Sequence, residues 1–273
     1  EVVAIYKDGR GFVWFATNTG LNRFDGERIK IFNRSIDGTS GTLYDGLKKV
    51  VEDGQGNLWM LGNKYVMFDW RKEVFINNTD SILKKMGLPP NPISIQVDQF
   101  KNFIVAYSQK GIYKYDPKHK RVVSFRPSND PMSILPAEIV EIAIKDEFVW
   151  ILHKDGFLER LNTRTKQIDI RKNYLNSRAI NSIIPKSIFI DSDHMVWIYP
   201  GINNRGVVCY NKTNDQWKQY DIDTKPALSN SFVRGIVADR QGLIWIATDH
   251  GGLNLLDKKK NSIQVLRHNE YNK

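Results

Sequence analysis

The sequence predicts an all-β protein, a β-propeller built from four-stranded antiparallel blades. One observation is a repeat that runs through all 273 residues. Another is the alternation of apolar and polar residues in short runs that end at Gly, Asp or Asn. A third is a Trp at the same place in nearly every copy. A four-stranded unit repeated every 40–50 residues or so is typical of a propeller blade, whereas a β-solenoid has a much shorter period.

Six copies of the repeat fill the chain. Consecutive copies are separated by 45, 45, 46, 47 and 48 residues when they are aligned on Trp14, Trp59, Ile104, Trp150, Trp197 and Trp245. We therefore predict blades at about residues 1–34, 43–77, 92–126, 137–172, 183–221 and 230–268. We interpret residues 1–273 as a single propeller and as a fragment of a longer sensor, and we expect a seventh blade outside this sequence to complete a seven-bladed ring.

Each blade is expected to contain four short strands. In the first blade, runs rich in β-branched and aromatic residues predict strands at Val2–Lys7, Gly11–Thr17, Gly20–Asp25 and Arg28–Phe32. The same pattern of strands and turn residues recurs in the other five blades. The connections between blades are longer and rich in Ser, Pro, Asn and Gly, and only residues 81–87 predict a helical turn.

The first two strands of a blade are joined by a turn that begins with Asp. This Asp stands six residues before the aligned position, as Asp8, Asp53, Asp98, Asp191 and Asp239, and the fourth copy has a shorter turn without it. An Asp side chain can accept hydrogen bonds from backbone N–H groups two residues on, and a following Gly supplies a positive φ. We predict that these Asp residues shape the turns and that the aligned Trp residues and Ile104 fill the space between neighbouring sheets.

Composition and spacing argue against several classes of site. The formal charge is +10, but the basic residues are dispersed and no groove-entering helix is predicted, so no bound nucleic acid is expected. The five His residues have no metal-ligand spacing and Cys209 is the single cysteine, so we expect no metal, no cofactor and no disulfide. No apolar run approaches the roughly 20 residues of a membrane span, and we interpret Glu1–Tyr6 as part of the first strand and not as a signal peptide.

The last copy carries the clearest resemblance to a known family. Residues 228–236 (LSNSFVRGI) and 239–248 (DRQGLIWIAT) resemble the two-component regulator propeller repeat, and the resemblance extends through all six copies, least in the third and fourth. It implies the periplasmic sensor region of a hybrid two-component system of the kind found in Bacteroides, with no catalytic residue in this segment. It further implies that the ligand is an oligosaccharide from a complex glycan, acidic glycans included, and that its detection controls glycan-utilisation genes. Outside this segment we expect further propeller and β-sandwich domains, a membrane span, a histidine kinase and a homodimer.

Ligands of propellers usually bind where the second-to-third-strand turns and the blade connections emerge. On that face we predict polar and cationic side chains at Asn18, Lys64, Lys110, His153, Lys154, Asn203, Arg205 and His250. Together they could pair with the hydroxyl and acidic groups of a sugar. The alternative for these residues is that they are solvated loop tips.

Two other functions stay open. One is a protein-interaction propeller without a small ligand, and the other is a propeller glycosidase or lyase. The repeated Asp box of sialidases places its Asp five positions before the Trp, whereas the distance here is six. The sequence also lacks a pair of carboxylates beside an arginine cluster, which weakens the case for glycosidic chemistry.

Overall fold

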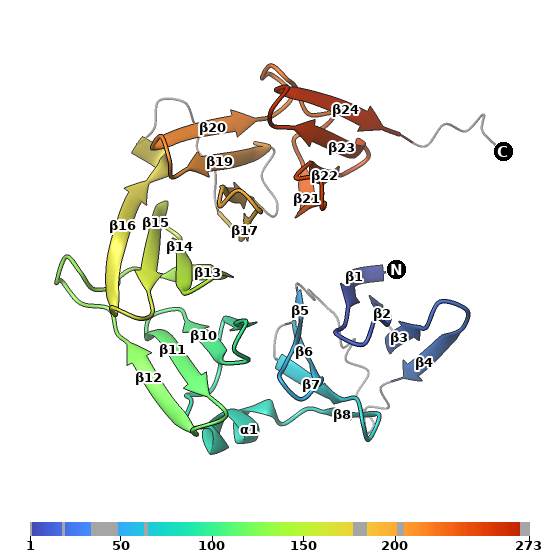
Figure 1. The fold of residues 1–273 in the computed structure, drawn as a ribbon, viewed down its shortest axis with the longest axis vertical. Coiled ribbons are helices and arrows are strands. Elements are labelled where there is room, and N and C mark those ends of the chain that lie inside the picture. The colour runs from blue at the N-terminus through green and yellow to red at the C-terminus, as the bar shows by residue number, and fades with distance from the viewer. Residues whose placement is uncertain are drawn as a thin grey trace. The chain divides into compact units, whose positions relative to one another are not determined.

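The computed structural model describes residues 2–17, 20–33, 49–62, 65–176, 185–200 and 205–267. It confirms the predicted fold class, an all-β propeller architecture with six four-stranded antiparallel blades (Figure 1). In every blade the strands pair in chain order, the first with the second, the second with the third and the third with the fourth. The chain divides into two compact units, residues 1–107 with 112–124 and residues 108–111 with 125–273.

The first unit holds three blades and the one α-helix among the described residues. Its elements are β1 (Val2–Lys7), β2 (Val13–Thr17), β3 (Gly20–Phe24), β4 (Ile29–Asn33), β5 (Lys49–Glu52), β6 (Leu58–Leu61), β7 (Tyr65–Asp69), β8 (Val74–Ile76), α1 (Thr79–Lys85), β9 (Ser94–Val97), β10 (Phe103–Tyr107), β11 (Gly111–Asp116) and β12 (Arg121–Phe125).

The second unit holds the other three blades and a short 3-10 turn. Its elements are β13 (Ile139–Lys145), β14 (Phe148–His153), β15 (Phe157–Asn162), β16 (Gln167–Asn173), η1 (Tyr174–Asn176), β17 (Ser187–Ile190), β18 (Val196–Tyr199), β19 (Val207–Asn211), β20 (Gln216–Tyr220), β21 (Val233–Ala238), β22 (Ile244–Thr248), β23 (Gly252–Asp257) and β24 (Ser262–Leu266).

The helix between the second and third blades begins two residues earlier than the sequence predicts. The Asn78 side chain accepts a hydrogen bond from the Ser81 backbone N–H at 3.2 Å, which caps the first turn. Gly87 follows the helix with φ 76°, a conformation that suits glycine, and the Leu88 N–H donates to the Leu83 carbonyl at 2.9 Å. The helix therefore occupies residues 79–85, where the sequence predicts 81–87.

Within the first unit, buried aromatic residues join each blade to the next. Trp14 lies in one hydrophobic cluster with Leu58 and Phe68 of the second blade, and its ring centroid is 5.6 Å from that of Phe68. Trp59 meets Phe103 of the third blade at the same 5.6 Å. These pairs bury large apolar surfaces between the sheets, so they stabilise the stacking of the blades.

The second unit repeats this arrangement. Trp150 clusters with Val196 and Tyr210 of the fifth blade, and Trp197 clusters with Ile244 of the sixth. Ile104, which stands in the Trp position of the third blade, is only 1% exposed. The tryptophan of the sixth blade differs, because its side chain is only half-buried.

The turn Asp residues explain the six-residue spacing to the tryptophan. In the first blade one carboxylate oxygen of Asp8 accepts from the backbone N–H groups of Arg10 and Phe12, at 2.9 and 3.0 Å. The other oxygen accepts from the indole N–H of Trp14 at 2.8 Å. Burial alone would raise the pKa of the Asp8 carboxyl, but the hydrogen bonds from Trp14 and Arg10 outweigh it and lower the pKa. The same carboxylate thus fixes the turn and the orientation of the indole.

The other turns vary this design. The indole N–H groups of Trp59, Trp197 and Trp245 donate to the turn carboxylates of their own blades at 3.0, 3.0 and 2.9 Å. The third blade has no indole at this place, and there the Asn102 side-chain amide donates to Asp98 at 2.8 Å. The carboxylate therefore keeps a side-chain donor where the tryptophan is replaced by Ile104.

Candidate functional site

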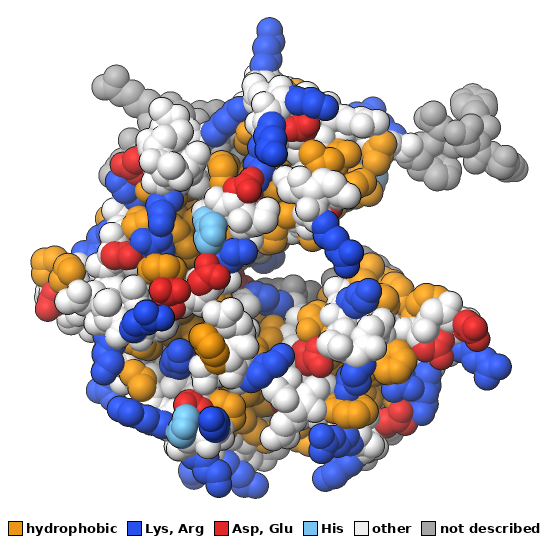
Figure 2. Space-filling model, viewed as in Figure 1, with side chains coloured by type: hydrophobic (Ala, Val, Ile, Leu, Met, Phe, Trp, Pro, Cys, Tyr) orange, Lys and Arg blue, Asp and Glu red, His pale blue; other side chains and the backbone are white. Residues whose placement is uncertain are grey.

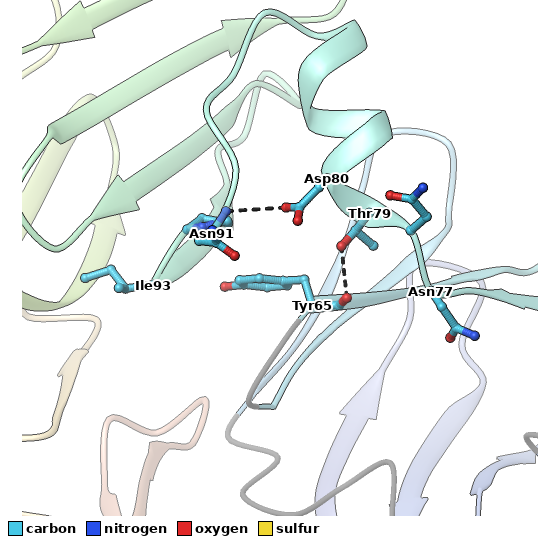
Figure 3. Close-up of a pocket in the computed structure, with 8 residues that line it drawn as sticks. Tyr65, Asn77, Thr79, Asp80, Asn91 and Ile93 are labelled. Carbon is cyan, nitrogen blue, oxygen red and sulfur yellow. Dashed lines mark hydrogen bonds between the residues drawn. The ribbon is translucent and has the colours of Figure 1, made fainter. Parts of the chain in front are cut away.

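A polar pocket lies in the first unit, between the start of β7 and the long connection from β8 to β9. It encloses about 500 Å³. Its lining residues are Tyr65, Asn77, Asn78, Thr79, Asp80, Asn91, Pro92 and Ile93. Figure 3 shows Thr79, Asp80 and Asn91 gathered around the ring of Tyr65, with Ile93 beyond it. We refer to this site as the amide pocket.

Hydrogen bonds hold the connection against the blade. The Thr79 hydroxyl donates to the Tyr65 carbonyl at 2.9 Å, which fixes the start of α1 over β7. The backbone N–H of Asn91 approaches an oxygen of Asp80 at 3.4 Å, a weak contact that joins the two ends of the connection (Figure 3). The backbone N–H of Ile93 donates to the Ala106 carbonyl of β10 at 2.9 Å. The pocket wall is therefore anchored to both neighbouring blades.

The side chains of the pocket offer both hydrogen-bond donors and acceptors. Asn77 and Asn91 are exposed, and their amide groups have no hydrogen-bond partner among the described residues. Asn78 uses its oxygen to cap the helix, and no described residue accepts a bond from its NH₂ group. Each such amide presents a donor beside an acceptor, and the Asp80 carboxylate adds acceptors. Among the described residues of the lining there is one carboxylate and no Lys, Arg or His.

Apolar groups complete the lining. The Tyr65 side chain is 5% exposed and belongs to the core between the second and third blades. Pro92 and Ile93, which are half-buried, also line the pocket. A site with flat apolar surface between paired donors and acceptors can contact both the C–H face and the hydroxyl groups of one ligand.

The predicted binding residues lie elsewhere or outside the described part of the chain. Asn18, Lys64 and Asn203 fall outside the described residues. Lys110, Lys154, Arg205 and His250 are exposed, and none of these four lines the amide pocket. The Lys154 ammonium is paired with the Glu138 carboxylate at 2.9 Å. Exposure agrees with their expected place at loop tips, but no shared pocket that we describe brings them together.

His153 is not at a loop tip, and this corrects the sequence interpretation of its position. It is the last residue of β14, with 0% exposure, and its Nε2 lies 2.8 Å from an oxygen of Glu159. Glu159 also accepts from the Arg171 guanidinium at 2.7 Å and from the Leu135 backbone N–H at 3.1 Å. Burial would raise the pKa of the Glu159 carboxyl, yet these donors together lower the pKa. His153 therefore serves a buried polar cluster within the fourth blade.

The sequence contains a signal for the amide pocket in addition to the predicted loop residues. The connection after β8 opens with Asn77-Asn78-Thr79-Asp80 and closes with Asn91-Pro92. Such Asn and Asp residues favour helix caps and turns because their side chains bond to nearby backbone. A connection of this length with capping residues at both ends indicates an ordered loop, which is where binding residues concentrate.

Other kinds of site find no support in the described part of the chain. No three of its His, Cys, Asp and Glu residues are arranged to hold a metal ion. Cys209 is buried, and burial raises the pKa of its thiol well above the ordinary value. No helix among these residues is both long and apolar enough to cross a bilayer. On the face drawn in Figure 2, Lys and Arg side chains are interspersed with Asp and Glu and form no single stripe.

Comparison with known proteins agrees with this architecture. Residues 227–250 match the model of the two component regulator propeller. No curated protein matches the sequence. The repeat in the sixth blade is therefore of the two-component regulator type, as its sequence predicts.

Two of the similar solved structures are much longer than this chain. The extracellular domain of a putative hybrid two component system from B. thetaiotaomicron is 22% identical, with a TM-score of 0.67 over 99% of this chain and 35% of that one. The extracellular domain of a putative one component system from the same organism is 18% identical, with a TM-score of 0.66 over 98% of this chain and 36% of that one. Virginiamycin B lyase from Staphylococcus aureus is 14% identical, with a TM-score of 0.62 over 95% of this chain and 82% of that one. At these identities the likeness shows the fold.

Proposed function

We propose that this chain is a ligand-sensing propeller of a hybrid two-component system and that its amide pocket binds a neutral oligosaccharide. The observation that carries the ligand proposal is the described lining of that pocket, whose residues offer paired amide donors and acceptors and include no cationic group. The two-component regulator repeat at residues 227–250 supports the sensor role. The extracellular domains of putative two component systems that share the fold support it as well.

The pocket chemistry matches a neutral sugar better than an acidic one. Sugar hydroxyls are both donors and acceptors, and Asn77 and Asn91 present both kinds of group. Tyr65, Pro92 and Ile93 supply apolar surface for the C–H faces of a pyranose ring. The carboxylate of Asp80 would repel a uronate or sulfate in a partly buried site. We therefore replace the acidic glycan suggested by the sequence with a neutral one.

Signalling requires more than the segment described. A ligand shifts an equilibrium only through a difference in its affinity for two states, so the response must involve domains that change their packing. This chain covers about a third of the extracellular domains that it resembles, 35% and 36% of their lengths. We propose that further propeller and β-sandwich domains, a membrane span and a histidine kinase belong to the same protein, which would act as a periplasmic sensor and a homodimer.

The test is calorimetry with a panel of neutral and acidic oligosaccharides. We expect saturable binding of at least one neutral member. Replacing Asn91 or Asp80 by Ala should weaken that binding by about fivefold each, since a hydrogen bond to a neutral partner contributes roughly 1 kcal/mol. The matched control is Asn129→Ala, which removes an exposed amide from a connection of the second unit and should leave the affinity unchanged.

Three outcomes would contradict the proposal. Tighter binding of acidic sugars than of neutral ones would indicate that the cationic loop residues, and not the amide pocket, form the ligand site. Turnover of a bound sugar would favour the glycosidase or lyase alternative. No binding to any sugar would favour a protein-interaction propeller.

A further inference from the structure

A second pocket lies in the first unit, where the turns of the second and third blades meet the end of α1. It encloses about 530 Å³. Its lining residues are Asp53, Gly54, Gln55, Asn57, Trp59, Met67, Ile82, Met86, Lys101, Phe103, Tyr115, Pro117, Lys118 and Lys120. We refer to it as the lysine-rimmed pocket. It shares no residue with the amide pocket, although α1 and its flanks contribute to both.

The floor of this pocket is apolar. Trp59, Met67 and Phe103 are buried side chains of the core between the second and third blades. Ile82 and Met86, from α1 and its C-cap, are half-buried beside them. Covering apolar surface of this kind stabilises a complex by roughly 25 cal/mol per Å² removed from water. The floor therefore favours a ligand with an apolar body.

The rim carries three cationic groups that no described carboxylate neutralises. Lys101, Lys118 and Lys120 are exposed, and no described residue pairs with their ammonium groups. Elsewhere, by contrast, Lys30 and Lys172 each reach a carboxylate at 2.6 Å. The rim of this pocket thus keeps its positive charge available for a ligand.

The one carboxylate in the lining is already engaged. The oxygens of Asp53 accept from the backbone N–H groups of Gln55 and Asn57 at 2.8 and 2.9 Å. They also accept from the Asn57 side-chain amide and the Trp59 indole, both at 3.0 Å. Asp53 is buried in its turn, so it does not offer a free acceptor to a ligand.

We propose that the lysine-rimmed pocket binds a small organic anion with an apolar body, a carboxylate or sulfonate carried on an acyl chain or an aromatic ring. Its volume lies within the roughly 300–1,000 Å³ of small-molecule sites. The apolar floor takes the body of the ligand, and the lysines form charge-assisted hydrogen bonds with the acid group. A neutral sugar lacks both features, so this proposal stands independently of the ligand proposed for the amide pocket.

The probe is sodium decanoate, used below its micellar concentration, with decan-1-ol as an uncharged match of the same chain length. Calorimetry should show saturable decanoate binding at one site and at least tenfold weaker binding of the alcohol. Decanoate affinity should fall as salt is raised, because exposed charges are screened. Equal binding of acid and alcohol would overturn the assignment of an anion site, and so would the absence of decanoate binding.

Two variants locate the site. The double substitution Lys118→Ala with Lys120→Ala should weaken decanoate binding by at least tenfold, because it removes charge without disturbing the floor. The matched control is Lys166→Ala with Lys212→Ala, exposed lysines on the corresponding third-to-fourth-strand turns of the fourth and fifth blades. Decanoate binding that is equally strong in both double variants would overturn the proposal.

The second variant, Met86→Trp, fills the pocket and keeps the three lysines. We expect it to abolish decanoate binding, with folding checked by its thermal transition. If decanoate bound to a folded Met86→Trp protein as it binds to the original, the ligand would lie elsewhere and the proposed location would be wrong.

Discussion

Trp197 and Trp245 occupy the same position in the fifth and sixth blades, yet their surroundings differ. Both indole N–H groups donate to the turn carboxylate six residues earlier, at 3.0 and 2.9 Å. Trp197 is 0% exposed and lies in one cluster with Ile244 and Ile246 of the sixth blade. Trp245 stands between those two isoleucines in β22, so its side chain points to the opposite face of the sheet, where it is half-buried.

The comparison separates two contributions to the repeat. The turn hydrogen bonds join residues within seven positions of one another, so each blade can form them alone. The packing of the indole depends on a second sheet that covers it. The same sequence pattern therefore specifies local geometry in each blade that carries it, while the stability that it provides depends on the neighbour.

The largest predicted effect is the difference between two alanine substitutions. Trp197→Ala should lower the free energy of unfolding by about 3–5 kcal/mol, because it leaves a cavity between two sheets. Trp245→Ala should cost only about 1–2 kcal/mol, because its side chain is already partly exposed. Chemical denaturation of the two variants measures both values, and equal costs would contradict the distinction.

The turn carboxylates should show a similar but smaller contrast. Asp191 is buried and accepts from two backbone N–H groups, from Trp197 and from the Lys258 ammonium. Asp191→Ala should destabilise by about 2–4 kcal/mol, because it leaves buried donors without an acceptor. Asp239 has no such lysine partner among the described residues, and its replacement should cost less. A greater loss for Asp239→Ala in the same denaturation assay would refute this order.

A third kind of carboxylate, Glu159, lies in a strand and not in a turn, and its contribution to stability should depend on pH. The pKa of Glu159 is lowered below its ordinary value of 4.5, since hydrogen bonds from His153, Leu135 and Arg171 outweigh its burial. A group with a lowered pKa in the folded state stabilises the protein above its unfolded pKa, and that contribution is lost as pH falls below about 4.5.

Glu159→Gln should therefore destabilise the protein by roughly 1–3 kcal/mol at neutral pH. The difference in the free energy of unfolding between the variant and the original protein should shrink as the pH falls below 4.5, the ordinary pKa of a Glu carboxyl. Denaturation curves between neutral pH and acid check this, and a constant difference would show that the charge of Glu159 contributes nothing.

The smallest predicted effect concerns the turn backbone in the same two blades. The sixth blade has Gly242 with φ 83°, and the fifth has His194 with φ 59° at the corresponding position. A left-handed conformation is unfavourable for a residue with a Cβ atom, so His194→Gly should raise the free energy of unfolding by about 0.5–1 kcal/mol. Gly242→His should lower it by a similar amount, and a stabilising effect of that second change would contradict the explanation.

The parts of the fold that sequence predicts are those with local or periodic causes. Asp8 and Trp14 are six residues apart, and their hydrogen bond recurs wherever that spacing recurs. The blade boundaries follow from the same period. The predicted start of α1 lies two residues after the observed one, because the apolar pattern alone does not include the capping residue Asn78.

The sites were harder to predict because their residues meet through a connection and a strand register. Tyr65 and Asn91 are far apart in sequence, and only the path of the connection after β8 places them in one pocket. His153 was expected at an exposed turn, but the pairing of Leu152 with Leu158 in β14 and β15 carries it into the blade beside Glu159. Such contacts depend on tertiary packing, which a single sequence pattern does not report.

Hydrogen–deuterium exchange, with and without a neutral oligosaccharide that binds, tests the proposed sensing site most directly. If the amide pocket holds the sugar, backbone amides of Tyr65 and of residues 77–93 should exchange more slowly at saturation, and Asn91→Ala should reduce that protection at the same ligand concentration. Protection confined to other segments, with residues 77–93 unchanged at saturation, would contradict the assignment of this pocket as the site of recognition.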